Sequence, residues 1–351
     1  MARKGERRIS AVSHATTLVR KVCTFANDTT LIDDSRVGLA RAGVIEAVRN
    51  HDDMVLFDWM LEVLSYQGVS DAVASGYIEY HGSVRAGDVA RGLQRRHLCP
   101  KLTSYWHFED CGYLKSTRSC SQPKSFRQCP LPRHDLRNGR LNQSAYSLFL
   151  FMRDIAGGDF VGWLDRRLAH ADTGTVPDRA EALAASVVEP MTHIYGVSDK
   201  VLSMSLSSLL IAGDPERERW QTAGAAMIVV DTLVHNWLHR TGILSRFGSD
   251  HLYGPKCYSE GGCATIIRRV AQRIDASAYN PDFPRTFPRF VQKALWQFCA
   301  QDHIAQCNGN RIDDRDRCGL SDCLLFSRCD RVTLQRPKPD TVAGCENILA
   351  I

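Results

Sequence analysis

The chain has 351 residues, of which 44% are hydrophobic, and its formal net charge at pH 7 is +5. This length supports one large domain or two modest domains with a sizeable core. The sequence contains no run of 18 uncharged apolar residues, so a membrane-spanning helix is not expected. The basic segment 1–8 is not followed by the apolar region of a secretory signal, which predicts a cytoplasmic protein.

Apolar residues at helical spacing predict a mostly α-helical fold, because strand-like alternation is scarce. The first strong helix is expected from residue 54, with an apolar face formed by Met54, Phe57, Leu61 and Leu64. Gly and Ser interrupt this helix, and Gln67 lies in the break. Ser70 then fits the N-cap of a helix over 71–80. Further helices are predicted over 145–155, 160–168, 177–188, 200–211, 263–274 and 290–300.

The segment 97–143 is rich in Cys, Pro and basic residues and shows little periodicity, which predicts a loop-rich insertion. The segment from Arg85 to Arg140 contains twelve Lys and Arg residues and four acidic residues, which gives an excess charge of +8. This excess suits a polyanion such as nucleic acid, and a solvated surface would carry the same charges.

Three evenly spaced cysteines in this insertion, Cys111, Cys120 and Cys129, are candidates for a second metal site. Together with a nearby histidine they could bind zinc, although the intervals are wide for a zinc finger. Unliganded cysteines fit the same spacing equally well.

A glycine turn joins the helices predicted over 177–188 and 200–211. Residues 194–200 read Ile-Tyr-Gly-Val-Ser-Asp-Lys, which fits a helix-hairpin-helix element. Glycine permits the turn, which points backbone N–H groups outward beside the positive end of the second helix. Gly196, Val197 and Ser198 are therefore candidates for binding a DNA phosphate without reading its sequence. A plain turn between two helices has the same pattern.

Lys200 and Asp231 are the candidate catalytic residues. A lysine in a partly dry pocket can lose its proton and attack a sugar C1′ as an amine nucleophile. A nearby carboxylate can stabilise the developing sugar cation and assist proton transfer. The alternative is an exposed lysine in a first helical turn and an aspartate that caps the next helix.

The turn-rich tail carries four cysteines within 23 residues. An odd total of thirteen cysteines, without a signal peptide, argues against a disulfide framework and for metal ligation. Four thiolates fit either a tetrahedral zinc ion or an iron–sulfur cluster. The four cysteines are Cys307, Cys318, Cys323 and Cys329.

These features, in this order, resemble the helix-hairpin-helix (HhH-GPD) DNA glycosylase superfamily, and most closely its endonuclease III branch. Residues 64–71 resemble the family's Leu-Ser-x-Gln-x-x-x-Asp segment, and residues 196–200 resemble its Gly-Val-Gly-x-Lys hairpin. Residues 230–232 resemble its catalytic Val-Asp-Thr helix start, and the tail cysteines resemble its [4Fe–4S] loop. Ser198 replaces the second glycine of the hairpin, so we expect strain in the turn or an altered phosphate contact.

The resemblance implies a two-lobed helical fold, with a six-helix barrel-like domain and a second domain that holds the cluster. The first domain is expected over 54–231, with the insertion at about 97–143. The second is expected to combine 1–53 with 232–335, including the cluster loop 307–329, and 336–351 would be a tail. The spacing of the tail cysteines is wider than in the family, which keeps zinc as the alternative to the cluster.

The implied function is excision of a modified base from double-stranded DNA. Gln67 would enter the duplex, Lys200 would form a Schiff base that permits β-elimination, and Asp231 would stabilise the sugar cation. Asp231 with a water would instead give simple hydrolysis. The substrate would be a damaged base in repair, or a bulky hypermodified base of phage DNA in defence. The protein would act as a cytoplasmic monomer associated with the nucleoid. The alternatives are a non-catalytic, structure-specific DNA-binding protein with a metal-stabilised tail and a zinc-stapled protein-interaction domain.

Overall fold

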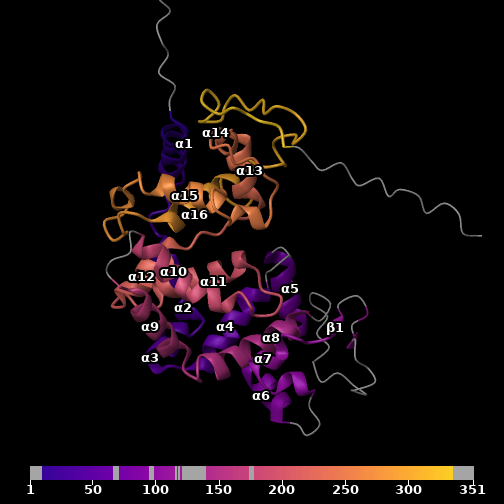
Figure 1. The fold of residues 1–351 in the computed structure, drawn as a ribbon. Coiled ribbons are helices and arrows are strands. Elements are labelled where there is room, and N and C mark those ends of the chain that lie inside the picture. Colours follow the sequence, from indigo (N-terminus) through magenta and orange to yellow (C-terminus); the bar gives the residue numbers. More distant parts are fainter. Residues whose placement is uncertain are drawn as a thin grey trace, which may run out of the picture. The chain divides into compact units, whose positions relative to one another are not determined.

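The computed structural model describes residues 10–65, 71–94, 99–114, 117, 119–120, 140–173 and 178–334 (Figure 1). Throughout this part the chain is mostly helical, as its periodicity predicts. Its one sheet within these ranges pairs β1 (Tyr113–Leu114) with β2 (Ser119–Cys120) in antiparallel register. None of the helices found here is long and apolar enough to cross a membrane.

The chain divides into two compact units. The larger unit comprises Thr29–Val229 and Ala276–Phe290, and the smaller comprises Met1–Asp28, Val230–Asp275 and Val291–Ile351. This division differs from the expected one at residues 29–53 and 276–290, which group with the larger unit, and at residues 230–231, which group with the smaller one.

The helical elements of the larger unit follow one another with short connections. They are α2 (Leu31–Arg41), α3 (Val44–Asn50), α4 (Asp53–Ser65), α5 (Asp71–His81), α6 (Ala86–Gln94), η1 (Pro100–Leu102), α7 (Tyr105–Phe108), α8 (Arg140–Leu150), η3 (Phe151–Ile155), α9 (Phe160–Ala171), α10 (Arg179–Met191), α11 (Asp199–Ala212), α12 (Glu218–Ala226) and η5 (Ala276–Ala278).

Helix α11 lies at the centre of the larger unit, packed against α2, α4, α10 and α12. Ten of its fourteen residues are buried, so it is apolar almost all round. Gly224 lets α12 approach closely, because a Cβ there would lie 2.7 Å from the Cγ2 of Ile211. The Ser207 hydroxyl also donates to the Gly224 carbonyl at 2.8 Å. The helix that carries Lys200 is therefore a fixed part of the core.

The apolar face predicted for α4 is correct except at its first residue. Phe57, Leu61 and Leu64 are buried, together with Leu56 and Met60. Met54 is 45% exposed, because it lies in the first turn of the helix and on the solvent side.

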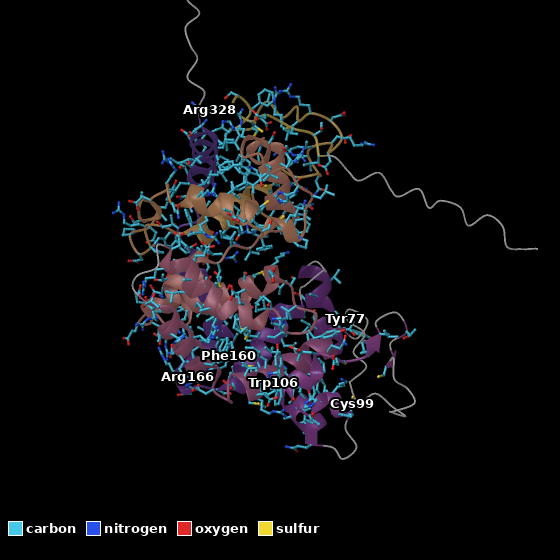
Figure 2. All side chains as sticks on the ribbon, viewed as in Figure 1. Tyr77, Cys99, Trp106, Phe160, Arg166 and Arg328 are labelled. Atoms are coloured by element: carbon cyan, nitrogen blue, oxygen red, sulfur yellow. The ribbon has the colours of Figure 1, made fainter. Side chains whose placement is uncertain are left out.

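The expectation that the segment 97–143 is merely a loop-rich addition is wrong for its first part. η1 and α7 form there, and Leu102, Tyr105 and Phe108 join the core of the larger unit. Trp106, on the other side of α7, is 60% exposed (Figure 2). An apolar residue at every third position is too short a signal to separate from a loop in the sequence.

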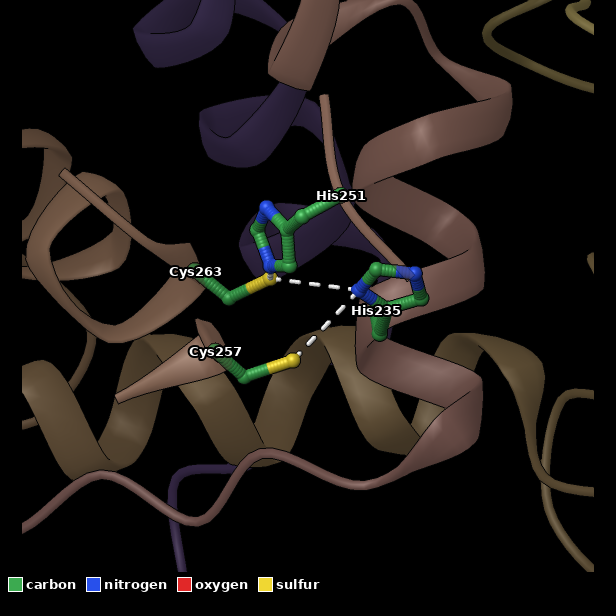
Figure 3. A group of neighbouring side chains, drawn as sticks. All are labelled: His235, His251, Cys257 and Cys263. Atoms are coloured by element: carbon green, nitrogen blue, oxygen red, sulfur yellow. Dashed lines mark hydrogen bonds between the residues drawn. The ribbon is translucent and has the colours of Figure 1, made fainter. Parts of the chain in front are cut away.

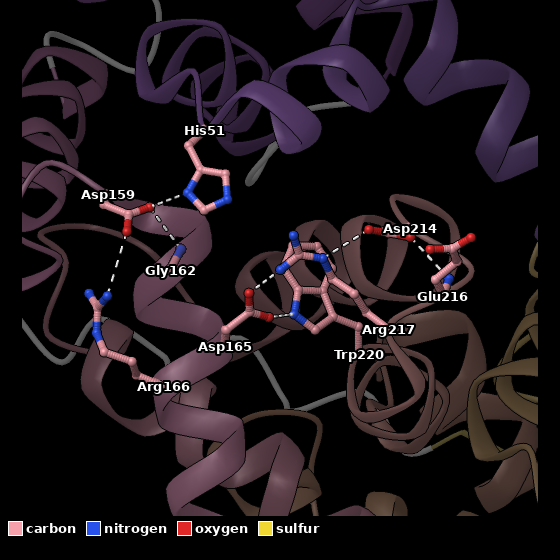
Figure 4. A network of polar contacts seen from close by, with 9 residues as sticks. All are labelled: His51, Asp159, Gly162, Asp165, Arg166, Asp214, Glu216, Arg217 and Trp220. Atoms are coloured by element: carbon pink, nitrogen blue, oxygen red, sulfur yellow. Dashed lines mark hydrogen bonds and ion pairs between the residues drawn. The ribbon is translucent and has the colours of Figure 1, made fainter.

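Partly exposed charge pairs fix the connection between α11 and α12. Arg217 forms ion pairs with Asp165 of α9 and with Asp214 (Figure 4). The indole Nε1 of Trp220 donates to Asp165 at 2.7 Å. The polar connector that follows the hairpin helix is therefore anchored at both ends by the carboxylates that Arg217 joins.

The smaller unit contains α1 (Ala11–Ala26), α13 (Thr232–Arg240), α14 (Ile243–Arg246), η4 (Pro255–Cys257) and α15 (Cys263–Ala271). Helix α16 (Pro288–Cys299) begins in the larger unit and continues into the smaller one. Residues 300–334 have no regular element, and backbone bonds attach them to the rest of this unit. One such bond joins the Val332 amide to the Arg240 carbonyl at 2.8 Å.

Candidate functional site

The predicted hairpin forms between α10 and α11. Gly196 has φ of 74°, a conformation that other residues adopt only with strain. Two serines of α8 hold the turn: Ser144 Oγ donates to the Tyr195 carbonyl at 2.8 Å, and the Tyr195 amide donates to Ser147 Oγ at 3.0 Å. A Cβ on Gly196 would also lie 3.3 Å from Ser144 Oγ, a tight contact that adds to the conformational preference for glycine.

The strain expected at Ser198 is absent, whereas the expected change in its phosphate contact stays a prediction. Its backbone is extended, with φ of −99° and ψ of 153°, which any residue adopts readily. It is the N-cap residue of α11, so a second glycine is not needed here. Lys200 follows as the second residue of α11 and is half-buried, next to the amides of the first turn.

Asp231 is the N-cap of α13 in the smaller unit. Its Oδ1 accepts a hydrogen bond from the Val234 amide at 2.9 Å, so the capping role is present. The preceding residue is also fixed, because the Val230 amide donates to the Tyr258 hydroxyl at 2.9 Å. Burial, with the charge of Asp231, raises the pKa of Tyr253. Lys200 and Asp231 thus belong to different units, and each is held within its own.

The four tail cysteines line one internal cavity of the smaller unit. Burial raises the pKa of the Cys323 thiol and raises that of Cys329 to about 12, and the neighbouring thiols add to both shifts. Thiols in such surroundings keep their protons unless a metal displaces them. The tail loop therefore places Cys307, Cys318, Cys323 and Cys329 around one cavity.

Five buried nitrogen donors, from four side chains, line the same cavity. Arg240 is 2% exposed and pairs with Asp314 through Nη2 at 2.7 Å, but its Nε and Nη1 have no hydrogen-bond partner in the described part of the chain. Buried donors without acceptors are costly, so a cavity lined by several of them suits an acceptor-rich group. The donors without a partner are Trp237 Nε1, Arg240 Nε and Nη1, Gln306 Nε2 and Arg331 Nε.

A second group of metal-ligand side chains lies at α13, and the sequence argument missed it. One ligand atom from each of His235, His251, Cys257 and Cys263 lies within 4.8 Å of the other three (Figure 3). Hydrogen bonds from the side chains of Cys263 and His235 lower the pKa of the Cys257 thiol to about 4. The hydrogen bond with Cys257, together with burial, raises the pKa of the Cys263 thiol. This cluster could bind a metal ion.

The sequence does carry a signal for this group, which is His235-x15-His251-x5-Cys257-x5-Cys263. The spacing is unlike a short zinc-finger pattern, and the helix predicted over 263–274 gives no sign that its first residue, Cys263, is a ligand. The group becomes visible once η4 and the start of α15 fold back onto α13.

The candidate metal site in the insertion is only partly described. Cys99 lies near Cys111 and Cys120, since burial raises the pKa of the Cys99 thiol and these two neighbouring thiols add to the shift. Cys120 lies on β2, opposite Tyr113 of β1. Cys129 and the duplex-entering candidate Gln67 lie outside the described residues.

No family model matches this sequence, and no curated protein or solved structure is similar to it at a significant level.

Proposed function

We propose that the protein is a DNA glycosylase that excises a modified base and has an associated lyase activity. The observation that supports this most is the cavity formed by the four tail thiols and the partnerless N–H donors. It suits the [4Fe–4S] loop that accompanies the hairpin and the aspartate in the endonuclease III branch. Non-specific contacts of the hairpin with phosphate would hold the duplex.

The chemistry begins when the target nucleotide is flipped out of the stack. Lys200, as the free amine, attacks C1′, and the bond between C1′ and the base nitrogen breaks. The base leaves with the bonding electron pair and takes up a proton. The nitrogen of Lys200 loses a proton, the C1′–O4′ bond of the sugar ring breaks, and O4′ takes up a proton, which leaves a C1′=N Schiff base. This Schiff base acidifies the C2′ hydrogen, so that loss of this proton expels the 3′ phosphate by β-elimination.

Asp231 supports this step through its fixed position. The Val234 amide and the positive end of α13 hold the carboxylate and favour its negative charge. A carboxylate held in this way stabilises a sugar cation without rearranging during the reaction. If the Lys200 amine does not attack, the same carboxylate can orient a water for simple hydrolysis of the glycosidic bond.

A [4Fe–4S] cluster would be held by Cys307, Cys318, Cys323 and Cys329. The sulfides of the cluster would accept hydrogen bonds from the donors around Arg240. A zinc ion brings no sulfides, so its four thiolates would leave some of these donors without an acceptor. Bound there, the cluster would supply a rigid, anionic centre around which the tail loop folds. In zinc coordination the sulfur atoms lie about 3.8 Å apart. Within the described residues, only the His235 group places its ligand atoms within 4.8 Å of one another.

The substrate we propose is a modified base in double-stranded DNA, either damaged or bulky. Release of free base from a panel of duplexes with oxidised, alkylated and hypermodified bases distinguishes the two. Activity confined to damaged bases would favour repair, and activity on the bulky bases would favour defence against phage.

Borohydride trapping tests the lyase chemistry, because reduction of the Schiff base joins enzyme and DNA permanently. Wild-type protein should give the adduct, and Lys200→Ala should give none. Lys101→Ala is the matched control in the same unit, since Lys101 pairs with Asp110. If a Lys200→Ala, Asp231→Asn variant still releases base at the wild-type rate, the catalytic residues lie elsewhere in the chain. If the wild-type protein binds these duplexes but releases base from none of them, the protein is a non-catalytic DNA-binding protein.

A further inference from the structure

The four side chains around His235 have the distances of a single tetrahedral metal site. Nδ1 of His235 lies 3.4 Å from Cys263 Sγ and 3.5 Å from Cys257 Sγ. Nε2 of His251 lies 3.4 Å from Cys263 Sγ. Zinc bonds of about 2.3 Å to sulfur and about 2.0 Å to nitrogen place the two atoms about 3.5 Å apart in a tetrahedron.

The surroundings of the ligands are also those of a metal site. Cys257 and Cys263 are fully buried, and His235 is nearly so. Nδ1 of His251 lies 2.6 Å from the Ser249 carbonyl, an acceptor that fixes the proton on Nδ1. Nε2 then carries the lone pair and faces Cys263, which is the arrangement by which a second hydrogen bond orients a metal-binding histidine.

We propose that His235, His251, Cys257 and Cys263 bind one zinc ion with a structural role. Two thiolates and two imidazoles are a common zinc donor set, and four protein ligands leave no position for a substrate or water. A two-iron cluster with the same residues would put the histidines on one iron and the cysteines on the other. The short His235–Cys257 and His235–Cys263 distances fit one ion better.

This zinc would join three pieces of the smaller unit. His235 belongs to α13, His251 precedes η4, Cys257 ends η4, and Cys263 begins α15. The segment between His251 and Cys257 carries Leu252 and Tyr253, whose exposed fractions are 67% and 44%. The centre of the Tyr253 ring lies 5.9 Å from that of the His235 ring. His235 itself lies one helical turn after Asp231 along α13.

The zinc would therefore hold an exposed apolar tip beside the start of α13. The metal site does not depend on the proposed glycosylase function. Its importance for Asp231 does rest on that function, so the experiment measures metal binding and local protection separately from base release.

Elemental analysis of the full-length protein, purified without chelators, should find one zinc per chain. His251→Ala and Cys257→Ser should lose that zinc and keep the iron of the tail site, whereas Cys323→Ser should lose iron and keep zinc. His303→Ala, an exposed histidine of the same unit, is the matched control. Loss of zinc should raise amide hydrogen exchange over residues 249–263, with or without any change in base release.

X-ray absorption of the wild-type zinc decides the case if the variants fail to fold. Two sulfur and two nitrogen ligands are expected. Four sulfur ligands, or a wild-type protein that holds no zinc and takes up no added Zn²⁺ or Co²⁺, would overturn the proposal. Zinc that persists in both His251→Ala and Cys257→Ser would overturn it as well.

Discussion

Asp231 has two separable roles, and the pair of variants Asp231→Asn and Asp231→Ala distinguishes them. The 2.9 Å bond from the Val234 amide to Oδ1 is an N-cap interaction. Asparagine caps a helix about as well as aspartate, whereas alanine costs about 1 kcal/mol in the free energy of unfolding. If the carboxylate is also catalytic, both variants should lose the charge that stabilises the sugar cation.

The expected pattern is therefore a stability difference without an activity difference. The free energy of unfolding of Asp231→Asn should lie within about 0.3 kcal/mol of the wild-type value, and that of Asp231→Ala should be about 1 kcal/mol lower. Both should excise base at least about 100-fold more slowly, as removal of one stabilising group in a transition state commonly causes. The assays are denaturant unfolding and single-turnover base release from a lesion duplex.

A capping role alone predicts the opposite pattern. Asp231→Asn would then keep the wild-type excision rate, and only Asp231→Ala would be impaired, in proportion to its unfolded fraction. That result would falsify the catalytic role of Asp231 and leave the capping role intact. Asp34→Asn is a matched control, because Asp34 accepts a hydrogen bond at 2.8 Å in the first turn of α2, away from α13.

Three further predictions concern the hairpin, an acid-sensitive contact and the tail. Gly196→Ala should weaken DNA affinity and cost about 1 kcal/mol of stability, because its backbone is left-handed. Gly82 has nearly the same φ and open space around it, so Gly82→Ala should lower stability alone. Equal DNA affinity of the two variants would contradict a role for the turn. The pKa of Asp154 is lowered, because the hydrogen bonds from Arg153 and the Tyr105 amide outweigh the opposing effect of burial. The stability that Asp154 contributes is complete above the ordinary carboxyl pKa and is lost as the pH falls through the lowered value. Asp154→Asn should therefore show a smaller drop in Tm between pH 6 and pH 3 than the wild type. Cys323→Ala should remove the visible absorption and bound iron, while Cys23→Ala, which changes a buried cysteine of α1, should keep both.

The parts of the fold that could be predicted are those with long apolar periodicity. The helix expected over 200–211 is α11 within one residue at each end, because ten of its fourteen residues are buried and the glycine turn precedes its start. The pieces η1 and α7 could not be predicted, since Leu102, Tyr105 and Phe108 span only seven residues among polar neighbours. Local pattern identifies an element only when the buried face is repeated over several turns.

The site was predictable to the same extent. The tail cysteines lie within 23 residues, and their closeness in sequence already favours closeness in space. His235, His251, Cys257 and Cys263 are spread over two helices and the loop between them, so only the packing of α15 against its neighbours brings them together. Sequence spacing shows a metal site when the ligands share one loop and conceals it when tertiary contacts assemble it.

Helix α13 links these features within the smaller unit. Asp231 caps its start, His235 belongs to the proposed zinc site, and Trp237 and Arg240 line the cavity of the tail thiols. A helix of nine residues has little stability of its own in water, so its orientation depends on what packs around it. The two proposed metal centres contact the same short helix one to two turns apart, and each restricts its movement. Under the proposed function, Asp231 must be held in place, and both metal centres would supply that rigidity, which gives a physical reason for so many cysteines in this unit.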